Sequence, residues 1–179
     1  MSDYVLQTED VAIHYGGVKA VDGVSITLER GQIRGLIGPN GAGKSTIIDA
    51  ITGRRRLTRG TVMLGGENVT ALGVRERRER GLSRSFQRTS IFEKMLVRRQ
   101  VELASFKAGT PDPGADADEV LTELSLDHLG DSTANDLGYG EQRRLDLALA
   151  LVGRPSVLLL DEPMAGLSVR ESHDLARHL

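Results

Sequence analysis

Short segments in which apolar and polar residues alternate predict β-strands in the first part of the chain. They cover residues 11–14, 24–28 and 61–64, and each is bounded by glycine or other turn residues. Alternation with a period of two, interrupted by turn residues, is typical of strands that pair in an antiparallel sheet. The first part of the chain is therefore expected to form an antiparallel β region.

A strand, a glycine-rich loop and a helix are predicted in succession further along. Residues 32–37 have a strand-like pattern and lead into the sequence Gly-Pro-Asn-Gly-Ala-Gly at 38–43. Residues 44–52 then have a helical pattern, and Gly53 is suited to end that helix. The alternating charges of residues 75–80 predict a helix face that is exposed to solvent and has no chemical role.

Helical patterns dominate between residues 91 and 152. Helices are predicted at 97–108 and 118–124, separated by a loop with the sequence Thr-Pro-Asp-Pro-Gly at 110–114. A third helix, 141–152, places Leu145, Ala148, Leu149 and Val152 on one face, and an apolar strand at 157–160 follows it. The prediction is a single domain spanning residues 4–179, with a helical subdomain at about 91–152.

Composition restricts the class of protein. With 179 residues, of which 39% are hydrophobic, the chain can bury one sizeable core. The 23 basic and 25 acidic residues nearly cancel, so no overall positive field favours nucleic acid as a partner. Cysteine is absent, which excludes disulfides and thiolate metal sites, and the acidic N-terminus lacks the features of a signal peptide. These two features fit a cytoplasmic setting. No stretch is apolar for the roughly 18 residues that a membrane-spanning helix needs, so a role at a membrane would require docking onto proteins that span it.

The segment from Gly38 to Ser45 matches the P-loop pattern at every fixed position, between a predicted strand and a predicted helix. Its glycines allow backbone N–H groups to turn toward phosphates, and the start of the helix adds partial positive charge. Lys44 is expected to reach the β and γ phosphates, and Ser45 to offer its hydroxyl to Mg²⁺. The alternative is a chance glycine turn, but the chain has only four lysines and one of them stands at the required place. The segment predicts binding of a nucleoside triphosphate.

Two carboxylates follow the predicted strand at 157–160. Asp161 can hold Mg²⁺, directly or through water, and Glu162 can accept a proton from the water that attacks the γ-phosphate. Taken alone, the segment also fits a solvated strand end. Combined with the P-loop, the two carboxylates predict hydrolysis of the nucleotide.

The order of these motifs resembles that of ABC ATPases over essentially the whole chain. Tyr15 lies 29 residues before Lys44, where the family places the aromatic residue that stacks on adenine; a partly buried strand tyrosine is the alternative. Gln87 matches the glutamine that contacts Mg²⁺ and the attacking water, and whose loop contacts the membrane subunits. The resemblance implies an α/β fold of the P-loop NTPase class, a RecA-like core with an antiparallel β subdomain and a helical insert.

Residues 137–142, Leu-Gly-Tyr-Gly-Glu-Gln, resemble the family signature, which is usually written Leu-Ser-Gly-Gly-Gln. In the family this segment contacts ATP held by the opposite subunit, so the resemblance implies a dimer. Gly138 lacks the usual serine hydroxyl and Tyr139 replaces a glycine, which is expected to weaken the γ-phosphate contact. Ser168 stands where the loop at 165–168 usually ends in an aspartate that communicates across the dimer.

Longer strings at residues 15–21, 33–38, 83–87 and 138–145 resemble the ATPases of branched-chain amino-acid uptake systems. The resemblance implies a peripheral subunit at the cytoplasmic face of the inner (plasma) membrane that powers amino-acid import, with ATP and Mg²⁺ as cofactors. Its expected partners are a second ABC ATPase subunit, transmembrane permease subunits and, indirectly, a periplasmic solute-binding protein. The alternatives are the ATPase of a urea or amide importer or of a lipopolysaccharide exporter, a soluble ABC ATPase acting on DNA or ribosomes, and an inactive, truncated nucleotide-binding fragment.

A switch histidine follows on a later strand in the family. Here the chain reaches Leu179 within a predicted helix that begins near Val169, and His173 and His178 come too early for that role. The sequence is therefore expected to be C-terminally incomplete, with slight hydrolysis and poor solubility.

The expected site residues form three sets. Catalysis is assigned to Glu162, Gln87 and Lys44, and the metal to Ser45, Gln87 and Asp161. Nucleotide contacts are assigned to Tyr15, Asn40, Gly41, Ala42, Gly43, Lys44, Ser45, Thr46, Gly138, Tyr139 and Gly140.

Overall fold

The computed structural model describes residues 4–85 and 90–178, and the chain divides into two compact units between Leu82 and Ser83. None of the helices within the described ranges has the length and apolarity that a bilayer crossing requires.

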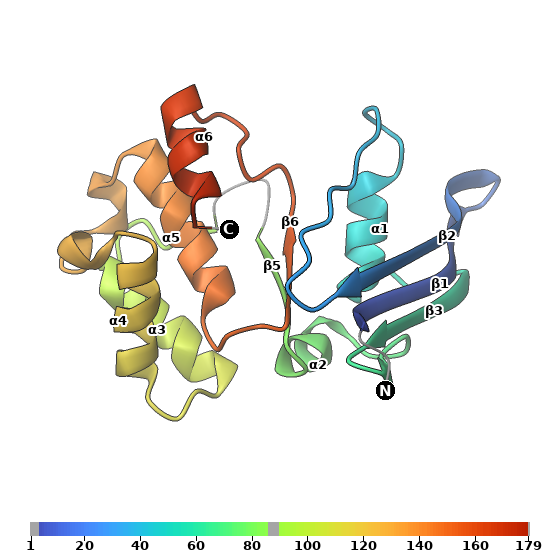
Figure 1. Ribbon diagram of the computed structural model, residues 1–179, viewed down its shortest axis with the longest axis horizontal. Helices are drawn as coiled ribbons and strands as arrows, with labels where there is room; N and C mark the ends of the chain where they lie inside the picture. The colour runs from blue at the N-terminus through green and yellow to red at the C-terminus, as the bar shows by residue number, and fades with distance from the viewer. Residues whose placement is uncertain (1–3, 86–89, 179) are drawn as a thin grey trace. The chain divides into compact units, whose positions relative to one another are not determined.

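The first unit is built on an antiparallel sheet with the strand order β2-β1-β3-β4 (Figure 1). The strands are β1 (Tyr4–Tyr15), β2 (Val18–Glu29), β3 (Arg59–Leu64) and β4 (Glu67–Asn68). Leu6 lies opposite Leu28 of β2 on one side and opposite Leu64 of β3 on the other. The three strands predicted from alternation are confirmed, and they are longer than predicted because ladder pairing continues into the polar residues at their ends.

Helix α1 (Lys44–Ile51) buries an apolar stripe in the first unit. Ile47, Ile48, Ala50 and Ile51 are the buried members, which fits a helix that packs with one face on the sheet. The strand predicted at 32–37 is wrong, since these residues join no sheet and the side chains of Ile33 and Ile37 are 83% and 96% exposed. An apolar pattern supplies no hydrogen-bonding partner for the backbone, and a strand requires one.

Helix α2 (Val74–Glu79) contradicts the prediction of a fully solvated face at 75–80. The side chain of Arg77 is only 2% exposed. Its guanidinium donates to the carbonyls of Ala50 and Ile51, at 2.8 and 2.6 Å. These carbonyls belong to the last turn of α1, whose final carbonyls have no partner within the helix. Arg77 therefore closes the C-terminal end of the helix that follows the P-loop.

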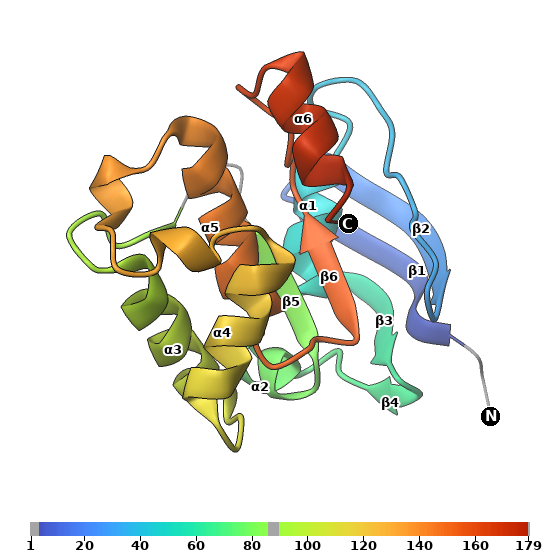
Figure 2. The same ribbon diagram turned by 60° about the vertical axis from the view of Figure 1, so that its left-hand side comes forward.

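The second unit contains a helical layer and a two-stranded sheet (Figure 2). Its helices are α3 (Val97–Ala108), α4 (Pro113–Glu123), α5 (Tyr139–Leu151) and α6 (Val169–Ala176), with short 3₁₀ turns at Asp127–Leu129 and Ala134–Asp136. Strand β5 (Leu82–Ser85) pairs with β6 (Val157–Leu160). The core between the helices is apolar and includes Val97, Val101, Val120, Leu121, Leu124 and Leu145.

The helix boundaries of the second unit follow the predictions at α3 and depart from them at α4. The predicted start at residue 118 is wrong by five residues, since α4 begins at Pro113. The Asp112 side chain accepts a hydrogen bond from the backbone N–H of Ala115 at 3.0 Å, so it caps the helix, and Pro113 occupies the first helical position. A capping aspartate followed by proline is a helix-start signal, although the same residues also suit a loop.

Candidate nucleotide site

The P-loop, residues 38–45, lies in the first unit and is shaped by a close backbone approach. Gly43 has a φ of 87°, and a Cβ placed there would lie 2.5 Å from the carbonyl oxygen of Ala20 in β2. Only glycine fits such a conformation without strain. In the described structure Gly43 gives α1 no side-chain cap, so the N–H groups of the first turn are not capped by a side chain. A helix start of this kind favours an anion.

The Lys44 side chain closes over the P-loop. Its ammonium donates to the carbonyl oxygens of Gly38 and Pro39, at 2.7 and 2.9 Å. The N–H of Ala42 donates to the Pro39 carbonyl at 3.2 Å and completes the turn that carries Asn40 and Gly41. Ser45 and Thr46 follow Lys44 in the first turn of α1. The Lys44 ammonium and several backbone groups of the P-loop therefore lie around a single short turn.

Tyr15 ends β1 at the hairpin with β2, also in the first unit. Its side chain is 48% exposed, so the ring is accessible to a base, and the same exposure fits the alternative of a partly buried strand tyrosine. The guanidinium carbon of Arg55 lies 6.0 Å from the centroid of the ring. A ring that already has a cation near its face can also stack on a nucleobase.

Asp161 follows β6 in the second unit and forms an ion pair with Arg84 of β5. The guanidinium Nη2 of Arg84 lies 3.0 Å from Oδ2 of Asp161, and the two side chains are 9% and 13% exposed. This contact fixes the carboxylate at the end of the strand. Carboxylate oxygens are the ligands that Mg²⁺ prefers, so the residue is chemically suited to the metal role assigned to it.

Glu162, the residue assigned as general base, is exposed and has an unusual backbone conformation. Its φ is 49°, in the left-handed region that non-glycine residues rarely adopt. The Arg143 side chain of α5 donates to the carbonyl oxygens of Glu162 and Pro163, at 3.1 and 3.0 Å. Gln87, the other residue assigned to the attacking water, lies outside the described residues.

The signature segment begins α5. The N–H of Gly138 donates to the Glu141 carboxylate at 2.8 Å, so the helix is capped by its own third residue. The hydroxyl of Tyr139 donates to the carbonyl of Ala165 at 3.2 Å. A Cβ at Gly166, where φ is 80°, would lie 2.9 Å from that hydroxyl. The tyrosine that departs from the family pattern is thus packed against the loop that precedes α6.

Glu171 of α6 reaches the start of α5. Its pKa is held below the ordinary value by the Ser168 hydroxyl, the Ser168 N–H, the backbone of Gly140 and the charge of Arg144. A Cβ placed at Gly140, one of the residues assigned to nucleotide, would lie 2.7 Å from Oε1 of Glu171, so a carboxylate of the same chain already lies beside this position. A phosphate that approached this position would compete with that carboxylate.

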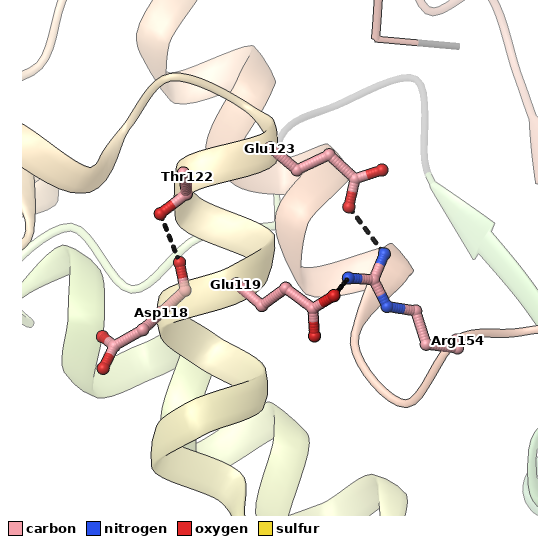
Figure 3. A pocket seen from close by; sticks show the side chains of 5 residues that line it. All are labelled: Asp118, Glu119, Thr122, Glu123 and Arg154. Carbon is pink, nitrogen blue, oxygen red and sulfur yellow. Dashed lines mark hydrogen bonds and ion pairs between the residues drawn. The ribbon is translucent and has the colours of Figure 1, made fainter.

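Another group of charged residues lines an open hollow beside α4 (Figure 3). Arg154 pairs with Glu119 and Glu123 there, at 2.7 and 2.6 Å. Asp118 pairs with Arg98 at 2.7 Å. These charges stabilise one another, and none of the residues assigned to nucleotide or metal lines the hollow.

The expected site residues are thus divided between the units, with Tyr15 and the P-loop in the first and the acidic and signature residues in the second. Sequence reasoning missed Arg84, Arg143 and Glu171. The only available signal was the spacing of Arg143 and Asp146, three residues apart on one helix, which suits an ion pair.

Comparison with known proteins identifies the family of the chain. The family model described as ABC transporter matches residues 21–165. The branched-chain amino-acid transport ATP-binding protein BraF of Pseudomonas aeruginosa is 34% identical, over 98% of this chain and 75% of its own length. The lipopolysaccharide export ATP-binding protein LptB of Haemophilus influenzae is 35% identical, over 97% of this chain and 73% of its own length.

Solved structures give the same result. The ADP conformation of an ATP-binding cassette of an ABC transporter has a TM-score of 0.88 at 30% identity, covering 99% of this chain and 76% of that chain. The chain belongs to the ABC transporter family and is an ABC-type ATPase with the P-loop NTPase fold.

Proposed function

We propose that this chain binds Mg·ATP and hydrolyses it as the ATPase subunit of an importer of branched-chain amino acids. The observation that carries the nucleotide site is the P-loop, in which Gly43 lies against the Ala20 carbonyl and α1 starts without a side-chain cap. The similarity to BraF, and to LivG of Escherichia coli at 33% identity, supports branched-chain amino acids as the solute.

Lys44 and the N–H groups around it would bind the β and γ phosphates. The ammonium would exchange its bonds to the Gly38 and Pro39 carbonyls for phosphate oxygens, which bind a cation more strongly than neutral carbonyls do. The Ser45 hydroxyl and the Asp161 carboxylate offer the oxygen donors that fit Mg²⁺. When bound, Mg²⁺ would neutralise charge on the phosphates.

Glu162 would accept the proton of the attacking water, with Gln87 orienting that water. Tyr15 would stack on the adenine, since its ring is exposed at the end of the hairpin. The segment Gly138–Gly140 would contact ATP held by a second ABC ATPase subunit. The remaining partners would be transmembrane permeases at the cytoplasmic face of the inner membrane and, through them, a periplasmic solute-binding protein.

Export of lipopolysaccharide is the second candidate function, because the chain is as similar to LptB as to BraF. Uptake of radiolabelled leucine by cells that lack LivG, with and without this chain, distinguishes the two. Restored uptake supports the importer. Absence of uptake, together with rescue of growth in cells depleted of LptB, would replace it with the exporter.

Two substitutions test the nucleotide chemistry. Glu162→Gln should keep ATP affinity and lower phosphate release by about 100- to 10,000-fold, because the amide keeps the shape and cannot accept the proton. Lys44→Ala should abolish ATP binding in a titration, because it removes the charge that faces the phosphates. Glu119→Gln and Lys107→Ala, both on surface helices, are the matched controls and should change neither quantity. Unchanged turnover in Glu162→Gln would show that another group is the base.

A further inference from the structure

The side chain of Arg143 on α5 is almost fully buried and is directed at the residues that follow β6. Its side chain is 2% exposed. Its Nε donates to the Pro163 carbonyl at 3.0 Å and its Nη2 to the Glu162 carbonyl at 3.1 Å. Burying a guanidinium is costly unless its donors are satisfied. The Arg143 guanidinium is satisfied in part by the carbonyls of Glu162, the residue proposed as the base, and of Pro163.

These two bonds restrain the backbone conformation of Glu162. The Glu162 carbonyl belongs to the peptide plane that sets ψ at that residue, and φ there is already left-handed, at 49°. A left-handed conformation costs a non-glycine residue roughly 1–2 kcal/mol. Such a conformation persists where the surroundings hold it in place. A planar donor fork bound to consecutive carbonyls can hold it, because it fixes both peptide planes at once.

Asp146 connects Arg143 to a second segment. One of its carboxylate oxygens, Oδ2, lies 3.7 Å from Nη1 of Arg143, and the side chain is 4% exposed. The same oxygen accepts from the Ser85 hydroxyl at 2.9 Å, and Oδ1 accepts from the Ser90 N–H at 2.9 Å. Ser85 and Ser90 are the described residues on either side of 86–89. All these contacts lie within the second unit, and they form one network around the buried side chains of Arg143 and Asp146.

We propose that Arg143 is a positioning residue for ATP hydrolysis, acting through the main chain of Glu162, and that Asp146 connects it to Ser85 and Ser90. This inference rests on the proposed role of Glu162 as the general base. A displacement of the carboxylate by about 1 Å can cost on the order of 100-fold in rate. Loss of the donor fork is therefore expected to lower kcat and leave ATP binding at the P-loop intact.

The test is Arg143→Lys. Lysine keeps the charge beside Asp146 but lacks the planar fork that binds both carbonyls, so a purely structural ion pair would tolerate it. The matched control is Arg99→Lys, since Arg99 and Glu102 also form an Arg–acid pair three residues apart on a helix of the same unit, but with the Arg99 side chain 65% exposed. Steady-state phosphate release by the purified chain with Mg·ATP gives kcat and KM, and circular dichroism reports folding.

The expected result is a kcat about 10- to 100-fold lower in Arg143→Lys, with KM and ATP affinity within about twofold of wild type. Arg99→Lys should match the wild type. Unchanged kcat in a folded Arg143→Lys variant would overturn the inference, as would an equal loss of kcat and ATP affinity. If Arg143→Lys does not fold, Arg143→Gln supplies the same comparison, since its amide can donate to one carbonyl but lacks the fork that binds both.

A double substitution separates the two proposals. In the Glu162→Gln background, Arg143→Lys should lower the residual single-turnover rate by less than about twofold, because a residue that acts through Glu162 has nothing left to position. A further tenfold loss would overturn the inference. If Glu162→Gln by itself leaves turnover unchanged, or the wild-type chain releases no phosphate, the proposed function fails and this inference fails with it. If Glu162→Gln abolishes turnover and Arg143→Lys does not change it, this inference fails alone.

Discussion

The buried arginine of α2 gives the clearest prediction about how the P-loop is supported. Arg77 donates to four carbonyls, those of Ala50, Ile51, Thr70 and Leu72, at distances of 2.6 to 3.0 Å. Hydrogen bonds from a charged donor contribute about 1.5–3 kcal/mol each, but the four are not additive. Burial also lowers the pKa of Arg77, so part of the gain offsets the cost of removing the guanidinium from water. Arg77→Met is therefore expected to lower the local stability by about 2–4 kcal/mol.

Hydrogen exchange at α1 measures this loss where it occurs. The amides of the last turn of α1 should exchange about 30- to 1,000-fold faster in Arg77→Met, as 2–4 kcal/mol implies. Arg75→Met is the control on the same helix, because Arg75 is 91% exposed and pairs only with a surface glutamate, Glu79, among the contacts described. It should cost no more than about 0.5 kcal/mol. Equal exchange rates in the two variants would refute the assignment of Arg77 as the cap of α1.

Three further predictions concern the loop, the ring and the signature segment. Tyr15→Ala should weaken ATP and ADP equally, by roughly 5- to 150-fold in a binding titration, because stacking of about 1–3 kcal/mol involves the base and not the γ-phosphate; a selective loss of ATP would contradict it. Gly43→Ala should abolish nucleotide binding, because its Cβ would lie 2.5 Å from the Ala20 carbonyl oxygen. Gly41→Ala is the control, since a Cβ there has no atom within 4 Å, and it should lower stability only by the strain of a left-handed alanine, about 1–2 kcal/mol. The pKa of Glu171 is lowered in the folded chain, so its contribution to stability is present above the ordinary value of 4.5 and is lost as the pH falls through the lowered pKa. The free energies of unfolding of wild type and Glu171→Gln, measured by urea titration, should therefore become equal in acid.

The fold was predictable where a local pattern and the tertiary structure agree. The alternation at 11–14, 24–28 and 61–64 gave three paired strands, and β6 has the predicted bounds, 157–160. Residues 32–37 have the same local signal and form no strand, because strand formation depends on a partner that lies elsewhere in the sequence. The start of α4 was missed since Asp112 and Pro113 suit both a turn and a helix cap.

The sequence motifs predict which residues belong to the candidate site. They do not predict which other side chains contact those residues. The P-loop spacing predicts a phosphate-binding role for Lys44. It contains no information about Arg77, which lies 26 residues after Ile51 and donates to the carbonyl at the end of α1. Charged residues on helices are usually solvated, so Arg77 and Arg143 were both expected on the surface or left unassigned. Their burial depends on carbonyls that helix and strand ends leave without partners, and that information is tertiary.

Tyr139 and Ser168 depart from the family pattern, and their contacts in the structure show what each residue does there. Compared position by position with the family pattern, Tyr139 and Ser168 are substitutions that remove a small residue and an acid. In the structure the Tyr139 hydroxyl donates to the Ala165 carbonyl at 3.2 Å, and the Ser168 hydroxyl and N–H both donate to the Glu171 carboxylate, at 2.6 and 2.8 Å. The same carboxylate lies beside Gly140 of the signature segment, where a Cβ would be 2.7 Å from Oε1 of Glu171. The two departures therefore belong to one set of contacts that joins the start of α5 to the start of α6, and a phosphate at Gly140 would have to displace a carboxylate that also caps α6. If the signature segment contacts nucleotide as proposed, that contact and the cap of α6 would be coupled through the Glu171 side chain, which a comparison of motifs alone could not show.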